Sequence, residues 1–153
     1  MDNMLFDNGV FSDPKINVTF CLVGKEADLS DISKCLNLVP SRTRTPDDWP
    51  EAIKNPKTKL PDYLQPRYSW VFDMKYEICN AVRLQFEKMH AILNGKVEII
   101  NKLKEKYTLE ASFEIGIHAQ HDQCNMPEVF LTHEIIAFAA SIGADIGFDM
   151  YLD

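Results

Sequence analysis

The sequence predicts an α+β fold: a four-stranded, mostly antiparallel sheet with helices on one face. Four segments alternate apolar and polar side chains with the two-residue period of a half-buried strand. Between them, apolar residues recur at three- and four-residue steps, the period of a helix that packs by one side. Because all four strands alternate, one face of the sheet should lie under helices and the other should face water or a partner.

The elements are expected in the order β-α-β, two helices, β-α-β, which is typical of a ferredoxin-like variant with enlarged connections. The first strand alternates from Ile16 to Leu22 and ends at Gly24. A short helix then spans about Leu29 to Leu36. Asp28 or Ser30 can cap its start, and Asn37 can take the left-handed exit.

The middle of the chain predicts a second strand from Tyr68 to about Tyr76, with Trp70 and Tyr76 on one face. Two helices follow, from about Ile78 to Leu93 and from Lys96 to Tyr107. The third strand alternates over Leu109–Ile117.

The last 23 residues carry the clearest pattern. A helix over Leu131–Ile142 has Thr132 as N-cap and Gly143 as left-handed stop. An alternating strand, Ala144–Asp153, follows at once. Its apolar side is expected to be buried, and its other side is acidic.

Length and composition indicate a single domain over residues 1–153, with a weakly ordered lead-in at 1–14 and a long proline-rich loop at 40–67. The net charge of −7 argues against direct binding to nucleic acid, which needs a basic surface. No segment is apolar enough to predict a membrane span, and no basic leader precedes an apolar run, so we expect a cytoplasmic protein with reduced cysteines.

The outer face of the sheet is the first candidate site. If the third and fourth strands are neighbours, their outward carboxylates share one surface with a tyrosine: Glu110, Glu114, Asp145, Asp149, Tyr151 and Asp153. Such a surface could dock a basic protein, since complementary charge speeds encounter and selects the partner. The alternative is a solvated face that discourages edge-to-edge association.

The proline-rich loop is the second candidate. Arg42 and Arg44 could clamp a phosphate or carboxylate, and Trp49 could anchor an interface. The alternative is a loop that packs over the edge of the core with Trp49 as its plug.

The third candidate comprises His118, His121, Asp122 and Cys124, whose residue types permit a transition metal. The spacing matches no standard zinc site and a fourth ligand is not obvious, so we expect a polar loop, no metal and no cofactor. The sequence has no Gly-rich phosphate loop, GxSxG or HExxH, which favours a binding protein over an enzyme.

The carboxyl end resembles a bacterial family of small proteins of unknown function. The resemblance rests on Leu131–Ile135 (LTHEI) followed by Ile142–Tyr151 (IGADIGFDMY), with further support from 28–40, Arg42 and Ser69-Trp70. It covers most of residues 15–152, and the segment after Arg44 departs from the family's usual pattern. The resemblance implies a cytosolic α+β protein without an assigned reaction.

Small acidic proteins of this kind also resemble immunity proteins of bacterial toxin systems, including contact-dependent growth inhibition. Our leading hypothesis is therefore a non-enzymatic immunity protein that covers the active site of a cognate toxin, a basic nuclease. The alternative is a small-ligand sensor or enzyme that uses the Arg42–Trp49 loop, with a pocket beneath it. A third alternative is an interaction domain or homo-oligomer built through the open sheet.

Overall fold

The computed structural model describes residues 12–54, 60–120 and 125–152, and it has a mixed α+β architecture. Its strands are β1 (Lys15–Gly24), β2 (Arg42–Arg44), β3 (Tyr68–Asp73), β4 (Glu77–Ile78), β5 (Glu110–Ala119) and β6 (Ala144–Leu152). Its α-helices are α1 (Leu29–Leu36), α2 (Glu51–Lys54), α3 (Val82–Leu93), α4 (Val97–Tyr107) and α5 (His133–Ser141). Short 3₁₀ turns are η1 (Pro46–Asp48), η2 (Asp62–Leu64) and η3 (Asn94–Lys96).

The strands form one six-stranded, mostly antiparallel sheet in the order β2-β3-β1-β5-β6, with β4 beside the first residues of β1. The expected four-stranded, ferredoxin-like arrangement is not confirmed, because the sheet has two further short strands, β2 and β4. β1 and β3 pair antiparallel, because the long connection between them leaves and re-enters at the same end, with Gly24 opposite Tyr68. β5 and β6 pair parallel, since α5 carries the chain back to the start of β5.

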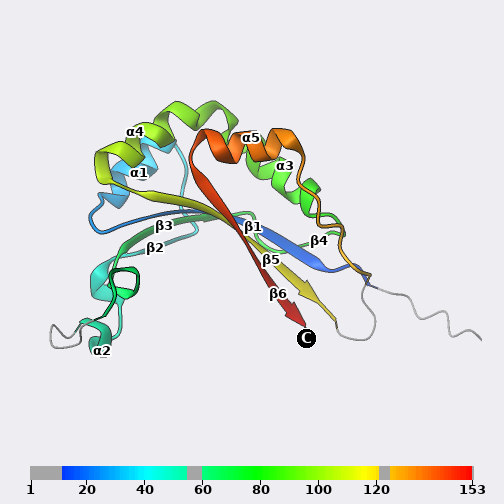
Figure 1. The fold of residues 1–153 in the computed structure, drawn as a ribbon, viewed down its shortest axis with the longest axis horizontal. Helices are drawn as coiled ribbons and strands as arrows, with labels where there is room; N and C mark the ends of the chain where they lie inside the picture. The colour runs from blue at the N-terminus through cyan, green and yellow to red at the C-terminus, as the bar shows by residue number, and fades with distance from the viewer. Residues whose placement is uncertain (1–11, 55–59, 121–124, 153) are drawn as a thin grey trace, which may run out of the picture.

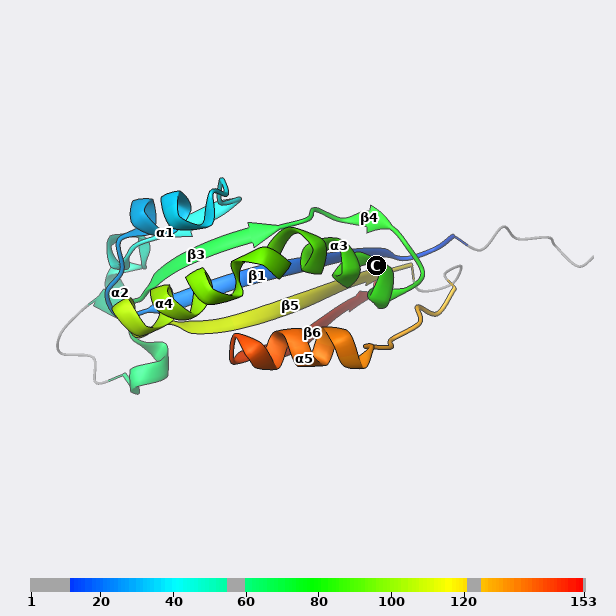
Figure 2. The ribbon, with the colours of Figure 1, turned by 90° about the horizontal axis from the view of Figure 1, so that it is seen from above.

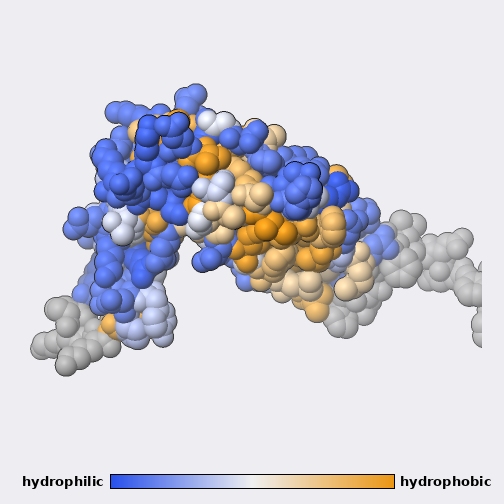
Figure 3. All heavy atoms as spheres, turned by 45° about the horizontal axis from the view of Figure 1, so that its top comes forward, coloured by the Kyte–Doolittle hydropathy of each residue, from blue (hydrophilic) through white to orange (hydrophobic). Residues whose placement is uncertain are grey.

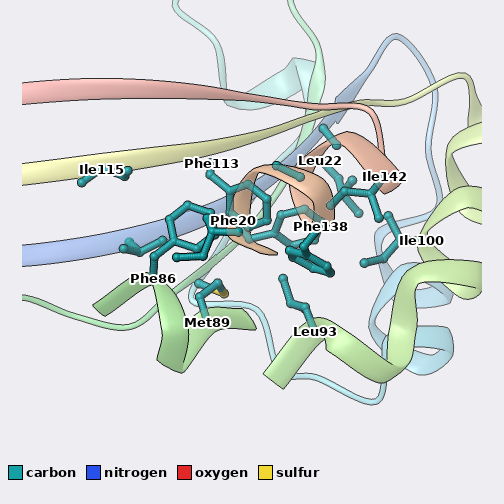
Figure 4. Packing of buried hydrophobic residues seen from close by; sticks show 14 of the residues in the cluster. Phe20, Leu22, Phe86, Met89, Leu93, Ile100, Phe113, Ile115, Phe138 and Ile142 are labelled. Atoms are coloured by element: carbon teal, nitrogen blue, oxygen red, sulfur yellow. The ribbon is translucent and has the colours of Figure 1, made fainter. Parts of the chain in front are cut away.

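Helices α1, α3, α4 and α5 lie on one side of the sheet, as the alternation predicts (Figures 1 and 2). The core lies between them and the sheet, and its aromatic rings meet around Phe113 of β5. That ring lies 5.2 Å from Phe20 of β1, 4.8 Å from Phe86 of α3 and 6.0 Å from Phe138 of α5, centroid to centroid. Figure 4 shows these side chains converging from the sheet and the helix layer.

Local end signals act as the sequence predicts. Asp28 accepts a hydrogen bond from the backbone N–H of Asp31 at the start of α1, and Asn37 ends that helix at φ 52°. Thr132 caps α5 by accepting from the N–H of Ile135. Gly143 has φ +57°, a left-handed conformation that glycine adopts without strain, and it turns the chain from α5 into β6.

The region after β3 departs from its simple alternation. Lys75 adopts φ 62°, which breaks the alternation, so Tyr76 leaves the core side and reaches the opposite face of the sheet, against Gly116. The following helix begins at Val82 rather than near Ile78. Ile78 instead belongs to β4, where it pairs with Lys15 of β1, and its side chain is 73% exposed. These corrections arise from contacts with β1 and β5, distant in sequence.

The proline-rich segment 40–67 is more structured than a plain loop. It contributes β2 to the edge of the sheet and contains η1, α2 and η2, which extend below one end of the sheet in Figure 1. The capping box of Thr45 and Asp48 fixes η1, with Pro46 at its first position.

The apolar side of β6 is the other correction. The alternation predicts that this side is buried, yet Phe148, Met150 and Leu152 are 45%, 54% and 64% exposed. Only Ala144 and Ile146, at the start of the strand, pack against the core. β6 is the outermost strand, and its second half extends beyond the helices that pack on the sheet (Figure 1).

Candidate acidic docking face

The candidate site is the open face, defined as the side of the sheet opposite α1, α3, α4 and α5. Directly opposed residues on neighbouring strands project to the same side. The pairing registers therefore place one row of side chains across this face. It runs from Arg42 of β2 at one edge of the sheet to Asp145 of β6 at the other, through Val71, Cys21 and Ser112. Strands lie about 4.8 Å apart, so the row is roughly 19 Å long.

Three carboxylates gather where β5 meets β6, and we call Glu114, Asp145 and Asp149 the acidic cluster. Glu114 lies opposite Gly147, with Asp145 and Asp149 two residues to either side of that glycine. Gly147 leaves room for the Glu114 carboxylate: a Cβ there would lie 2.5 Å from Glu114 Oε2. Glycine at this position thus lets the longer side chain lie over β6 between two aspartates.

The electrostatics of the cluster are unfavourable to full ionisation. Burial raises the pKa of the Glu114 carboxyl above its usual range, and the negative charges of Asp149 and Asp145 raise it further. In the described part of the chain, no ion pair involves any of the three. The cluster is therefore a concentrated negative charge that the described residues do not neutralise.

Acidic residues elsewhere are often paired with the chain's own bases. On the helix side, Asp31 accepts hydrogen bonds from Lys106 at 2.8 Å and Tyr107 at 2.6 Å, which lower its pKa to about 2. Other pairs are Glu77–Lys88, Glu87–Arg83, Glu98–Lys102 and Glu51–Lys54. The absence of such pairs distinguishes the cluster from these other surfaces.

The remaining acidic candidates separate from the cluster. Glu110 lies at the start of β5 and forms a 3.2 Å ion pair with Arg67, so its charge is partly compensated. Asp153 lies outside the described residues. The structure therefore brings Glu114, Asp145 and Asp149 together, with Tyr151 further along the same side of β6.

An aromatic row, not predicted from the sequence, continues the face beyond the cluster. His118 stacks on Tyr151 at 4.6 Å and meets Tyr76 edge-on at 4.7 Å. A hollow of about 390 Å³ beside it is lined in part by Lys15, Asp13 and Ile78. Strand pairing of His118 with Tyr151 was the signal that could have revealed this row, had the strand order been known.

The basic edge lies at the opposite side of the same face. Arg42 and Arg44 of β2 are exposed, and the Arg44 guanidinium stacks over the Trp49 ring at 4.5 Å. The Trp49 indole N–H donates to the carbonyl of Arg67 at 3.2 Å. Trp49 therefore packs against its own chain, and the open face is negative at β5–β6 and positive at β2.

The chemistry available at the centre of the face is limited. Burial raises the pKa of the Cys21 thiol to about 11, and the Glu114 charge adds to the effect, so the thiol stays protonated at neutral pH and is a poor nucleophile. Within residues 12–54, 60–120 and 125–152, no group of three or more His, Cys, Asp or Glu side chains could hold a metal. His118 lies on β5, whereas His121, Asp122 and Cys124 lie outside the described residues.

None of the helices in the described ranges combines the length and apolar character needed to cross a bilayer. No curated protein and no solved structure matches the chain. Among protein families, Domain of unknown function (DUF4279) matches residues 14–153. Because this match covers nearly the whole chain, the protein belongs to the DUF4279 family.

Proposed function

We propose that this protein is a non-enzymatic binding protein whose open face docks a basic protein, and that the partner is a cognate toxin domain of the nuclease class. The observation that carries the proposal is the acidic cluster of Glu114, Asp145 and Asp149, which has no ion-pair partner in the described part of the chain. Because these carboxylates repel one another, the approach of a cationic surface lowers their electrostatic free energy more than it would for carboxylates that are already paired.

The sheet supplies a rigid platform for this contact. Backbone pairing with β5 along the whole of β6 fixes Asp145 and Asp149, so little conformational entropy should be lost on docking. Tyr151 and the aromatic row offer apolar contact area beside the charges, the composition typical of interface hot spots. Arg42 and Arg44, at the far edge, would orient the partner by repelling its basic surface.

A nuclease fits this description because its substrate cleft must be basic to bind phosphates. A protein that covers the cleft with carboxylates excludes the nucleic acid and needs no chemistry of its own. In this proposal the chain acts as an immunity protein, and blocked substrate access is the mechanism.

Titration of the protein with a basic nuclease toxin domain, if one is encoded by an adjacent gene, tests the proposal. We expect calorimetry to show an association that weakens as sodium chloride rises. The double substitution Asp145→Lys and Asp149→Lys should weaken it at least about tenfold, because like charges then face each other. Both side chains are exposed, so the fold should tolerate the changes.

A matched control makes the same change of charge elsewhere. Glu26→Lys with Glu105→Lys alters two exposed glutamates on other surfaces and should leave binding within about threefold, since long-range steering is all that changes. Equal losses in both double variants would show that net charge, not the acidic cluster, drives association. Absence of binding at micromolar concentration would reject the toxin partner.

A further inference from the structure

The outer edge of β6 has little of the protection usual for an edge strand. β6 pairs with β5 over nine consecutive residues, Ala144 to Leu152, without a bulge. In the described part of the chain, no strand pairs with its other side. Natural edge strands are usually short, charged (most often with lysine), bulged or interrupted by proline, because an open edge recruits further strands. β6 contains no proline, lysine or arginine, and its two charged residues, Asp145 and Asp149, both project to the open face.

The opposite edge of the sheet is protected in several of these ways. β2 has only three residues, two of them arginine, and it lies between Pro40 and Pro46. One molecule therefore combines a protected edge with an unprotected one. This contrast leaves the β6 edge open to pairing with a further strand.

Apolar side chains accompany the open edge. Phe148, Met150 and Leu152 on β6 are about half exposed, and Ile136 on α5 is 52% exposed. Figure 3 shows apolar residues gathered on this side of the molecule, over α5 and β6. Side chains of this size, each half exposed, present on the order of 400 Å², which falls within the range of functional patches.

We infer that β6 pairs antiparallel with β6 of a second copy, about a two-fold axis at Phe148 and normal to the sheet. Such an axis keeps both helix layers on the same side, so residues of one face oppose residues of the same face. Apolar positions then meet apolar ones: Phe148 opposes its own copy, Ile146 opposes Met150, and Ala144 opposes Leu152.

The charge pattern of β6 is compatible with this register and disfavours the adjacent ones. With Phe148 on the axis, Asp145 opposes Tyr151 of the second copy and Asp149 opposes Gly147, so no carboxylate directly faces another. Each Asp145 can accept a hydrogen bond from the opposed Tyr151 hydroxyl. Moving the axis by one residue along the strand, to 147 or 149, would set aspartate directly against aspartate, which is destabilising. Self-pairing in one register is therefore compatible with the sequence of β6.

The interface area also points to a second copy. A stable contact buries about 800 Å² on each partner, and the apolar patch supplies roughly half of that. The backbone edge and the flanks of the two α5 helices, which the axis brings together, would supply the rest. The dimer would also join two acidic clusters into one surface, an arrangement that does not depend on the proposed toxin.

Sedimentation velocity of the full chain at micromolar concentration tests the dimer. We expect a reversible dimer that tightens as sodium chloride rises, because Asp149 lies diagonally from its copy, within about 8 Å. This salt dependence is opposite to that of docking to a basic protein. Phe148→Lys should produce a monomer with unchanged circular dichroism, while Ile78→Lys, at an exposed apolar residue of β4, should remain dimeric.

Cysteine cross-linking tests the register. In Phe148→Cys the two new thiols would have Cα atoms about 4.5–5.5 Å apart, within the range of a disulfide. In Met150→Cys, each new cysteine would oppose Ile146 of the second copy. The two cysteines would then be offset by four residues along the strand, about 13 Å, which is too far for a disulfide. Mild oxidation should therefore link the first variant and not the second, with the linked peptide identified by mass spectrometry.

Three outcomes would overturn the inference. A native chain that stays monomeric at micromolar concentration would reject the second copy as occupant. Dimers that survive Phe148→Lys would place the contact elsewhere. Cross-linking through position 150 rather than 148 would reject the register.

Discussion

β5 and β6 are neighbours with the same alternation in sequence, yet they have different surroundings. On β5, Phe113, Ile115 and Ile117 are completely buried. On β6, Phe148 lies opposite Ile115 and is 45% exposed. Alternation therefore tells which side of a strand is apolar, but position in the sheet decides whether that side is covered.

The difference has a simple geometric cause. β5 lies between β1 and β6 and beneath the helix layer, so aromatic rings from α3 and α5 reach Phe113. β6 is the last strand, and only its first residues pack against the core. A central strand thus contributes to stability by burial, whereas the apolar side of β6 remains available to another molecule.

Two phenylalanine truncations should separate these roles most strongly. Phe113→Ala removes the ring on which Phe20, Phe86 and Phe138 converge, and it should lower the free energy of unfolding by about 3–5 kcal/mol. Phe148→Ala should change it by less than about 1 kcal/mol, because the ring is already half exposed. Urea unfolding at low protein concentration measures both.

Concentration provides the control for that pair. Dilution dissociates any dimer, so the small effect of Phe148→Ala should grow as protein concentration rises, and that of Phe113→Ala should not. Similar losses from both variants in dilute solution would mean that Phe148 is covered within the monomer.

Much of the fold follows from local chemistry in the sequence. The structure confirms the local predictions, because each depends on neighbours within a few residues. These are the bounds of α1, the caps at Asp28 and Thr132, and the left-handed residues Asn37 and Gly143. Strand order is not local. The antiparallel pairing of β1 with β3, and the short strands β2 and β4, depend on contacts between distant segments that no periodicity encodes.

The candidate site divides in the same way. Alternation predicted that Glu114, Asp145 and Asp149 point outward, and the register between β5 and β6 brings them together. The sequence did not reveal the aromatic row, because the backbone turn at Lys75 sends Tyr76 to the open face. Nor could it show that Arg42 and Arg44 share that face with the acidic cluster, since this depends on three intervening strands.

Two glycines on the open face, Gly116 of β5 and Gly147 of β6, extend the comparison of the two strands to smaller changes in stability. A Cβ at Gly116 of β5 would overlap the Tyr76 hydroxyl and lie 3.0 Å from its Cζ, so the ring would have to leave His118. Gly116→Ala should therefore cost about 1–2 kcal/mol of unfolding free energy. Gly147→Ala of β6 meets only the flexible Glu114 carboxylate and should stay within about 0.5 kcal/mol.

Nuclear magnetic resonance provides the structural readout for the two alanines. Gly116→Ala should change the ring-current shifts of the His118 protons, whereas Gly147→Ala should move the Glu114 resonances and leave His118 unaffected. A costly Gly147→Ala would show that the Glu114 carboxylate is held in place rather than free to move.

The smallest effect concerns the charge of Glu114 itself. Burial and the nearby aspartates raise its folded pKa, so ionisation costs more in the folded state than in the unfolded one. The stability linked to protonated Glu114 is present below the unfolded pKa of about 4.3 and is lost as pH rises through the folded pKa. Glu114→Gln should therefore be slightly more stable than the native chain at pH 7, with the difference vanishing below about pH 4.

Asp31 on the helix side provides a control of opposite sign. Lys106 and Tyr107 lower its pKa to about 2, so its contribution is fully present above the unfolded pKa and is lost as pH falls through the folded pKa. Asp31→Asn should therefore destabilise at pH 7, and its effect should shrink as pH falls from about 4 toward 2. Urea unfolding across this range should give difference curves of opposite sign. If Glu114→Gln instead destabilised at pH 7, the Glu114 carboxylate would be gaining support from a cation, and the acidic cluster could not be the uncompensated charge on which docking depends.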